Sequence, residues 1–145
     1  MQNINEMRLD FPAIPENEGF ARMVISAFLV QADPSVGLLS EVRTAVSEAV
    51  TNAVVHAYKG AAVGEGRIVL RAELEEGLLR VEVEDFGRGI EDVEQAMQPF
   101  YTSEPDGERT GMGFTLMQSF MDGVTVRTEP GHGTLVRMEK RLEEP

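Results

Sequence analysis

One long stretch, Leu39 to Tyr58 (LSEVRTAVSEAVTNAVVHAY), places the strongest constraint on how this chain can fold. Its apolar residues recur at steps of three and four, which is the spacing of one buried face of an α-helix. The stretch contains no Gly or Pro, and Asp33-Pro34-Ser35 provides helix-start signals just before it. We therefore expect a long helix whose buried face consists of Val42, Ala45, Val46, Ala49, Val50 and Ala53.

Glu48 and Asn52 stand four residues apart in this stretch, so they lie one above the other beside the apolar face. A carboxylate and a carboxamide one helical turn apart can together hold a hard cation through oxygen ligands. Ordinary surface polar residues would show the same spacing, and short motifs often match by chance. The pair becomes a candidate site only in combination with features further along the chain.

Composition limits the classes of protein to consider. The 145 residues include no cysteine, which excludes disulfides and cysteine-ligated metals and agrees with a reducing cytoplasm. We expect one domain over residues 1–145, with no signal peptide and no apolar run long enough to cross a membrane. The formal charge of −12 argues against direct nucleic-acid binding and leaves room for a basic protein partner. A phosphate-bearing ligand would need local neutralisation, most simply by Mg²⁺.

The remaining elements follow from hydrophobic alternation and from turn residues. Long helices grouped apart from hairpins predict an α/β two-layer sandwich, with a mixed, mainly antiparallel sheet covered on one face by helices. No Walker-type glycine loop is present, which excludes a P-loop nucleotide site. The expected strands are residues 7–11, 67–75, 79–85, 124–129 and 134–140, and the other expected helices are residues 16–31, 91–97 and 112–121.

The helix expected at residues 16–31 is apolar on nearly every side. Glu18, Arg22 and Ser26 form its only polar row. A helix of this kind is buried on more than one side, so we expect one side to pack on the domain and the other to meet a partner. In this interpretation Arg22 is an isolated cation that contacts the partner; the alternative is an ordinary solvated arginine.

The alternation of residues 79–83 continues inward to Asp85. A carboxylate on an apolar face is costly unless a partner hydrogen-bonds it. Gly87 and Gly89 follow at once, and their lack of a side chain lets the chain approach a flat ligand closely. Residues 98–113 then form a long, glycine- and proline-containing loop, and loops of that length inside a compact domain are usually functional.

These features form an ordered set: Glu48 and Asn52, Asp85-Phe86-Gly87-Arg88-Gly89, the loop, and Arg109-Thr110-Gly111-Met112-Gly113. Together with Gly133-Thr134, the set resembles the ATP-binding boxes of the GHKL superfamily, which includes gyrase B, histidine-kinase catalytic domains and MutL. Within that superfamily, SEAVTNAVVHAY, DFGRGI, PFYTSEP and ERTGMGF resemble the small bacterial serine kinases that act as anti-sigma factors, above all the sporulation type. The resemblance covers nearly the whole chain.

The resemblance implies the Bergerat (GHKL) ATP-binding fold and a role for each matched residue. Asn52 would ligate Mg²⁺ at the phosphates of ATP, and Asp85 would accept a hydrogen bond from the adenine amino group. Glu48 would orient or deprotonate the attacking hydroxyl. The other implied contacts are Gly87, Gly89 and Thr134 around the base, and Arg109, Gly111 and Gly113 at the phosphates.

The activity implied by the resemblance is that of an ATP-dependent serine-protein kinase. It would phosphorylate an anti-anti-sigma factor, sequester a sporulation sigma factor of the sigma F type, and act as a cytoplasmic homodimer. Three alternatives stay open: a stress-response (sigma B type) anti-sigma kinase, a detached histidine-kinase catalytic domain, and a non-catalytic ATP-binding module that sequesters a sigma factor. The intact Asp-x-Gly-x-Gly box argues against the first, and Glu48 beside Asn52 argues against the third.

Two positions depart from the family pattern. Ala57 stands where relatives often have Gly, a difference that concerns packing. The loop reads Thr102-Ser103-Glu104 where relatives carry a basic residue, so one phosphate contact of the family lacks its cation here.

Overall fold

The computed structural model describes residues 5–58, 60–61, 65–90 and 113–142. Within these ranges every expected strand and helix is present, and apart from the C-terminal end of the central helix the bounds shift by at most a few residues. The short helix expected at residues 91–97 lies outside the described residues, as does nearly all of the loop. The elements are β1 (Asn5–Pro12), α1 (Glu16–Val30), α2 (Val36–Asn52), η1 (Ala53–Ala57), β2 (Arg67–Glu75), β3 (Leu78–Asp85), α4 (Gly113–Phe120), β4 (Gly123–Glu129) and β5 (Gly133–Arg141).

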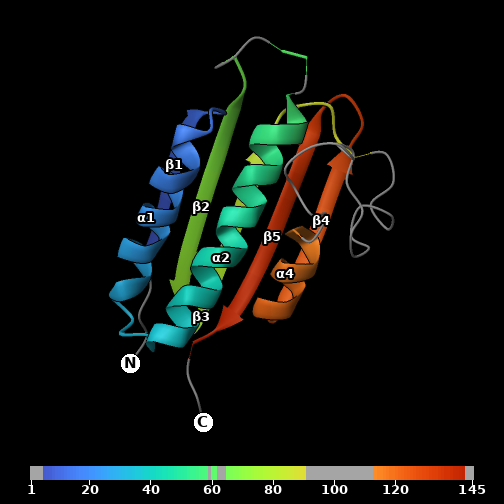
Figure 1. Cartoon of the computed structure of the whole chain (residues 1–145). Coiled ribbons are helices and arrows are strands. Elements are labelled where there is room, and N and C mark those ends of the chain that lie inside the picture. Colours follow the sequence, from blue (N-terminus) through green and yellow to red (C-terminus); the bar gives the residue numbers. More distant parts are fainter. Residues whose placement is uncertain (1–4, 59, 62–64, 91–112, 143–145) are drawn as a thin grey trace.

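The strands form one five-stranded sheet in the order β1-β2-β3-β5-β4, and all four described pairings are antiparallel. Helices α1, α2 and α4 lie on the same face of this sheet, so the molecule has two layers (Figure 1). The predicted α/β two-layer sandwich, covered on one face by helices, is confirmed. The sheet was predicted to be mixed, but in the described residues it is wholly antiparallel.

The core lies between the two layers and is built from the predicted faces. Inward residues of β2 and β3, such as Leu70 and Val81, are fully buried, and so are Met117 of α4 and Met138 of β5. All six apolar residues predicted on the buried face of the central helix are at most 4% exposed, five in α2 and Ala53 in η1. Ser35 caps α2, since its side chain accepts a hydrogen bond from the Leu38 backbone N–H at 3.1 Å. None of the described helices has the length and apolar character needed to cross a bilayer.

The central helix differs from the prediction at its C-terminal end. A single α-helix was expected to reach Tyr58, but the α-helical part ends at Asn52 and the wider π-helix η1 continues to Ala57. A turn of π-helix contains an extra residue and therefore changes the direction of the backbone groups that follow it. Here the redirected carbonyl group of Ala57 accepts a hydrogen bond of 2.9 Å from the backbone N–H of Arg88.

Helix α1 packs on one side and is open on the other. Ala21, Ile25, Phe28 and Leu29 are buried, whereas Phe20, Met23 and Val30 are half or more exposed. Arg22 is not an isolated cation as predicted, because its guanidinium lies 3.8 Å from the carboxylate of Glu18 one turn earlier. Glu18 also accepts a hydrogen bond from the Ser47 hydroxyl of α2, so the Glu18 end of the polar row contacts the neighbouring helix, while Arg22 stays exposed.

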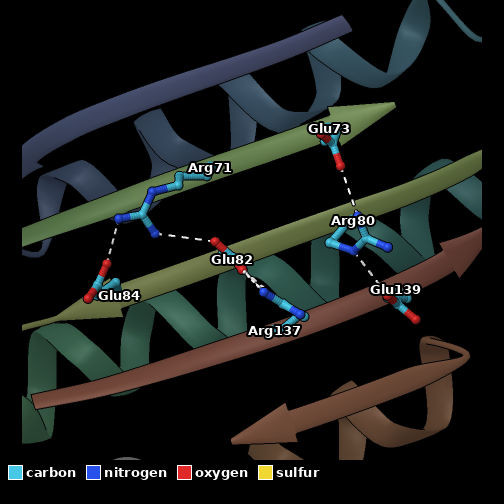
Figure 2. Close-up of polar contacts among 7 residues, drawn as sticks. All are labelled: Arg71, Glu73, Arg80, Glu82, Glu84, Arg137 and Glu139. Carbon is cyan, nitrogen blue, oxygen red and sulfur yellow. Dashed lines mark hydrogen bonds and ion pairs between the residues drawn. The ribbon is translucent and has the colours of Figure 1, made fainter. Parts of the chain in front are cut away.

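The face of the sheet opposite the helices is covered by charged side chains. They form two rows of ion pairs that cross the strands (Figure 2). Each arginine in these rows pairs with carboxylates on neighbouring strands, at distances of 2.5 to 3.3 Å. The first row runs Glu84–Arg71–Glu82–Arg137, and the second runs Glu73–Arg80–Glu139.

Candidate functional site

The candidate site lies at the end of the sheet where β3 ends and β5 begins. Asp85, the last residue of β3, is paired in register with Ile68 of β2 and with Thr134 of β5. Asp85 is 8% exposed and Thr134 is 7% exposed, and in the described part of the chain they are the two buried polar residues. Burying polar groups side by side on an otherwise apolar face is costly, which marks this position as a site rather than as core.

Burial dominates the electrostatics of Asp85. Loss of water around the carboxylate raises the pKa of Asp85 to about 6, and the neighbouring charge of Glu84 acts in the same direction. Backbone hydrogen bonds from Gly87 and Thr134 oppose that rise. One carboxylate oxygen accepts from the Gly87 N–H at 3.0 Å. A carboxylate has about four acceptor positions, so Asp85 keeps capacity for a ligand that donates hydrogen bonds.

Thr134 is oriented by a residue that sequence reasoning missed, Thr128 of β4. The Thr128 hydroxyl donates to the Gly133 carbonyl at 3.1 Å and accepts from the Ile90 backbone N–H at 2.9 Å. It also lies 3.0 Å from the Thr134 hydroxyl. Since Thr128 has a single proton, Thr134 is the donor in that pair, and its own lone pairs stay available as acceptors. Asp85 and Thr134 thus present acceptor oxygens side by side.

Gly87 and Gly89 make close approaches, but to the protein's own backbone. We expected them to leave space for a flat ligand. Instead, a Cβ on Gly87 would come within 2.0 Å of the Ala57 carbonyl oxygen. Gly89 has a φ of +80°, and a Cβ there would lie 2.8 Å from the carbonyl oxygen of Glu129. The glycines therefore let the loop after Asp85 lie between η1 and the β4–β5 turn.

Glu48 and Asn52 lie on consecutive turns of α2, as predicted, and both are half-buried. Asn52 is the last residue of α2, directly before the π-helix whose end contacts the loop after Asp85. Gly113 is buried and begins α4. Two predicted phosphate contacts, Arg109 and Gly111, lie outside the described residues, together with Thr102-Ser103-Glu104.

The oxygen-bearing side chains near the site suit Mg²⁺, which needs few protein ligands, better than a metal ion that is held by protein ligands alone. Within the described ranges, no three His, Asp or Glu side chains are grouped closely enough to hold a metal ion. Mg²⁺ usually takes one or two protein oxygens and completes its shell with substrate phosphates and water. The carboxamide oxygen of Asn52 would be a protein oxygen of that kind.

Tyr58 is the second residue of the site that sequence reasoning missed. It follows the π-helix, and its hydroxyl accepts a hydrogen bond from the backbone N–H of Phe86, directly after Asp85. The sequence signal for this role is weak, because it consists of one tyrosine at the end of a helical pattern.

Comparisons with known proteins identify the family of this chain. Residues 11–140 match the family model described as the histidine kinase-like ATPase domain. Anti-sigma F factor of Clostridium botulinum (strain Eklund 17B / Type B) is 47% identical over 138 residues, covering 95% of each chain. Anti-sigma F factor of Bacillus subtilis (strain 168) is 44% identical over 138 residues, covering 95% of this chain and 93% of that protein.

A solved structure supports the same fold. The crystal structure of the RsbU and RsbW domains of Rv1364c from Mycobacterium tuberculosis has a TM-score of 0.71 to this chain at 21% sequence identity. The match covers 97% of this chain and 33% of that one, and at this identity it concerns the fold alone. The chain belongs to the histidine kinase-like ATPase domain family and, within it, to the group of proteins named anti-sigma F factors.

Proposed function

We propose that this protein is an ATP-dependent serine-protein kinase that phosphorylates an anti-anti-sigma factor and sequesters a sigma factor of the sigma F type. The observation that carries the proposal is the buried pair Asp85 and Thr134, aligned in register at the end of the sheet. Its acceptor oxygens match the donating amino group of adenine. The family membership and the names of its close relatives support the same activity.

In this proposal the site divides into a base half and a phosphate half. Asp85 accepts a hydrogen bond from the adenine amino group, and the Thr134 hydroxyl lines the same pocket. Asn52 would hold Mg²⁺, and the bound ion would neutralise the negative charge of the phosphates in a strongly acidic protein. Gly113, Gly111 and Arg109 contribute to the phosphate half, because a helix N-terminus with a nearby cation favours anions.

Glu48 is the proposed general base. It takes the proton from the serine hydroxyl of the protein substrate as the serine oxygen attacks the γ-phosphorus of ATP. The bond from that phosphorus to the β–γ bridging oxygen breaks, so phosphoserine forms and ADP leaves. Phosphoryl transfer depends mainly on positioning and charge neutralisation, so one carboxylate beside Asn52 meets its chemical requirements.

The partners are proposed to bind on the open side of α1. Phe20, Met23 and Val30 are exposed there, and Arg22 lies in the polar row beside them with its side chain 45% exposed. The sigma factor and the anti-anti-sigma factor would compete for this surface. Strand β1 pairs on one side with β2 and is an edge of the described sheet, which supports a homodimer formed through that edge. We place this homodimer in the cytoplasm, in line with the family resemblance.

A phosphotransfer assay tests the proposal. The protein is incubated with Mg²⁺, γ-labelled ATP and a purified anti-anti-sigma protein, and the label on serine is followed, with Glu48→Gln as the control. Labelled phosphoserine with wild type and little with Glu48→Gln supports the proposal. Binding of ATP and of a sigma factor with no transfer to any candidate substrate would replace it with the non-catalytic alternative.

A further inference from the structure

We infer that Tyr58 is a positioning residue that holds the loop after Asp85 in place and thereby sets the preference of the site for adenine. The inference rests on the proposed function, because it concerns the base half of the same nucleotide site. Tyr58 touches neither the reacting atoms nor, in this proposal, the nucleotide. Its effect is transmitted through the backbone that carries Asp85.

Two hydrogen bonds of the Tyr58 hydroxyl connect segments that are far apart in sequence. The oxygen accepts from the backbone N–H of Phe86 at 2.7 Å and donates to the backbone carbonyl of Arg67 at 2.5 Å. Phe86 follows Asp85, and Arg67 is the first residue of β2. One phenol therefore joins the end of the π-helix to the start of β2 and to the end of β3.

The protonation state of Tyr58 suits this double role. Donation to a carbonyl oxygen requires the neutral phenol, which can accept at the same time. Burial raises the pKa of Tyr58 above its ordinary value, and the charge of Asp85 raises it further, although the backbone hydrogen bonds of Phe86 and Arg67 oppose this. Tyr58 thus stays protonated at neutral pH.

The ring of Tyr58 is held in place by Gly66. A Cβ on Gly66 would lie 2.3 to 2.5 Å from three carbon atoms of the ring, so the ring lies flat against that glycine. The Gly66 carbonyl in turn accepts a hydrogen bond of 2.9 Å from the backbone N–H of Ala13, after β1. The hydroxyl is therefore presented to Phe86 from a fixed position.

A second link from the neighbouring residue completes the arrangement. The Ala57 carbonyl accepts from the Arg88 N–H at 2.9 Å, so Ala57 and Tyr58 bind the loop at Arg88 and Phe86. Gly87 lies between these two points, and its own N–H donates to the carboxylate of Asp85. The orientation of the Asp85 carboxylate thus depends on a loop that is hydrogen-bonded at both ends. The Tyr58 hydroxyl provides the bond at Phe86, and the Ala57 carbonyl provides the bond at Arg88.

Removing the hydroxyl leaves the Phe86 N–H without this partner and frees one end of the loop. We expect Tyr58→Phe to weaken ADP binding about three- to tenfold, in line with the loss of one or two hydrogen bonds. The phosphate half is carried by other elements, so binding of GDP should change little. The ratio of the two dissociation constants is the informative quantity.

The experiment is a competition assay against a fluorescent ADP analogue, with Mg²⁺, that gives Kd for ADP and GDP. It compares wild type, Tyr58→Phe and Leu74→Val. Leu74 is a core residue at the opposite end of β2, paired with Leu79, so its truncation lowers stability away from the site. A reduced ADP preference in Tyr58→Phe with an unchanged preference in Leu74→Val supports the inference. Equal preference in all three proteins overturns it.

Gly66→Ala is a second, independent variant. It keeps the Tyr58 hydroxyl but introduces a Cβ where the ring now lies, so it should reproduce the loss of ADP preference. A Gly66→Ala protein with wild-type preference contradicts the inference even if Tyr58→Phe fails to fold. Failure of the wild-type protein to bind ADP would overturn the proposed function. Normal ADP binding that does not change in the Tyr58 variant would overturn only the present inference.

Discussion

Gly87 packs directly against the carbonyl group of Ala57, and a Cβ at Gly87 would come within 2.0 Å of that oxygen. The contact joins the loop after Asp85 to the π-helix that continues the helix of Glu48 and Asn52. The loop of the proposed base half is therefore in direct backbone contact with the π-helix that follows Asn52.

Gly87→Ala tests this contact. The new methyl group has no space without backbone movement, so we expect a loss of about 1–3 kcal/mol in the free energy of unfolding together with weaker ADP binding. Urea unfolding and ADP titration measure the two effects. Gly37→Ala is the matched control, because no atom lies within 4 Å of its added Cβ and alanine favours the first turn of α2. Similar results for both variants would contradict the packing argument.

Asp85→Ala should remove the main contact with adenine while the fold survives. The loss of a hydrogen bond to a charged acceptor costs about 1.5–3 kcal/mol, which is roughly a ten- to hundredfold rise in Kd for ADP. Isothermal titration with ADP and Mg²⁺, alongside a circular dichroism spectrum, measures both affinity and fold. Unchanged affinity in a folded variant would remove the adenine assignment.

The raised pKa of Asp85 predicts opposite pH dependences for stability and binding. The folded carboxyl ionises at about 6, against an ordinary value of 3.8, so between these pH values the folded state binds more protons than the unfolded state. The titration of Asp85 therefore lowers the free energy of unfolding as pH rises through this range, by up to roughly 3 kcal/mol.

In the proposed role of Asp85, the ionised carboxylate accepts a stronger hydrogen bond from the adenine amino group than the protonated form does, so the ADP affinity should fall as pH drops below about 6. Asp85→Asn is the control for both measurements, because its side chain cannot titrate. In the binding measurement, subtracting the Asp85→Asn pH profile also removes the effect of titrating the ADP phosphates. Wild-type and Asp85→Asn profiles of the same shape would show that another group is responsible.

Glu48→Gln and Asn52→Ala should separate chemistry from binding. Loss of a general base typically lowers the rate by about 10²–10⁴-fold, so Glu48→Gln should bind Mg·ATP normally and transfer phosphate slowly. Asn52→Ala should weaken Mg·ATP binding itself. Single-turnover assays at saturating ATP, with separate binding titrations, distinguish the two roles. Equal effects of both variants on both measurements would contradict this division.

Arg22→Glu should abolish co-purification with both the sigma factor and the anti-anti-sigma factor. The reversed charge would repel the partner carboxylates and also Glu18, which lies beside Arg22 in the free protein. Because Arg22 is at the surface, ADP binding should stay normal in the same sample. Arg43→Glu, an exposed charge reversal on α2, is the control. Intact complexes with Arg22→Glu would exclude Arg22 from the interface.

Much of the fold was predictable because the strands alternate and the apolar residues of the central helix recur at helical spacing. The inward position of Asp85 follows from counting alternate residues along β3, and its buried state confirms that count. The π-helix was not predictable, because one extra residue per turn leaves the local composition unchanged. The strand order was also beyond local patterns, since β5 lies between β3 and β4 through long-range pairing.

The candidate site was predictable only where side chains themselves carry the chemistry. Tyr58 and Thr128 were missed because their importance comes from backbone groups that they bind, and those groups have no sequence signature. The sequence predicted that the backbone at Gly87 and Gly89 approaches other atoms closely, but those atoms belong to the protein's own backbone. A sequence pattern indicates that space is needed and does not identify what occupies it.

The paired charges on the open face of the sheet also make that face sensitive to dissolved salt. In the rows Glu84–Arg71–Glu82–Arg137 and Glu73–Arg80–Glu139, each arginine lies against carboxylates of neighbouring strands, and most of these side chains are partly exposed. Ions in solution screen attractions of this kind, whereas they leave apolar packing in the core on the other face intact. High ionic strength should therefore loosen one face of the sheet and leave the other unchanged.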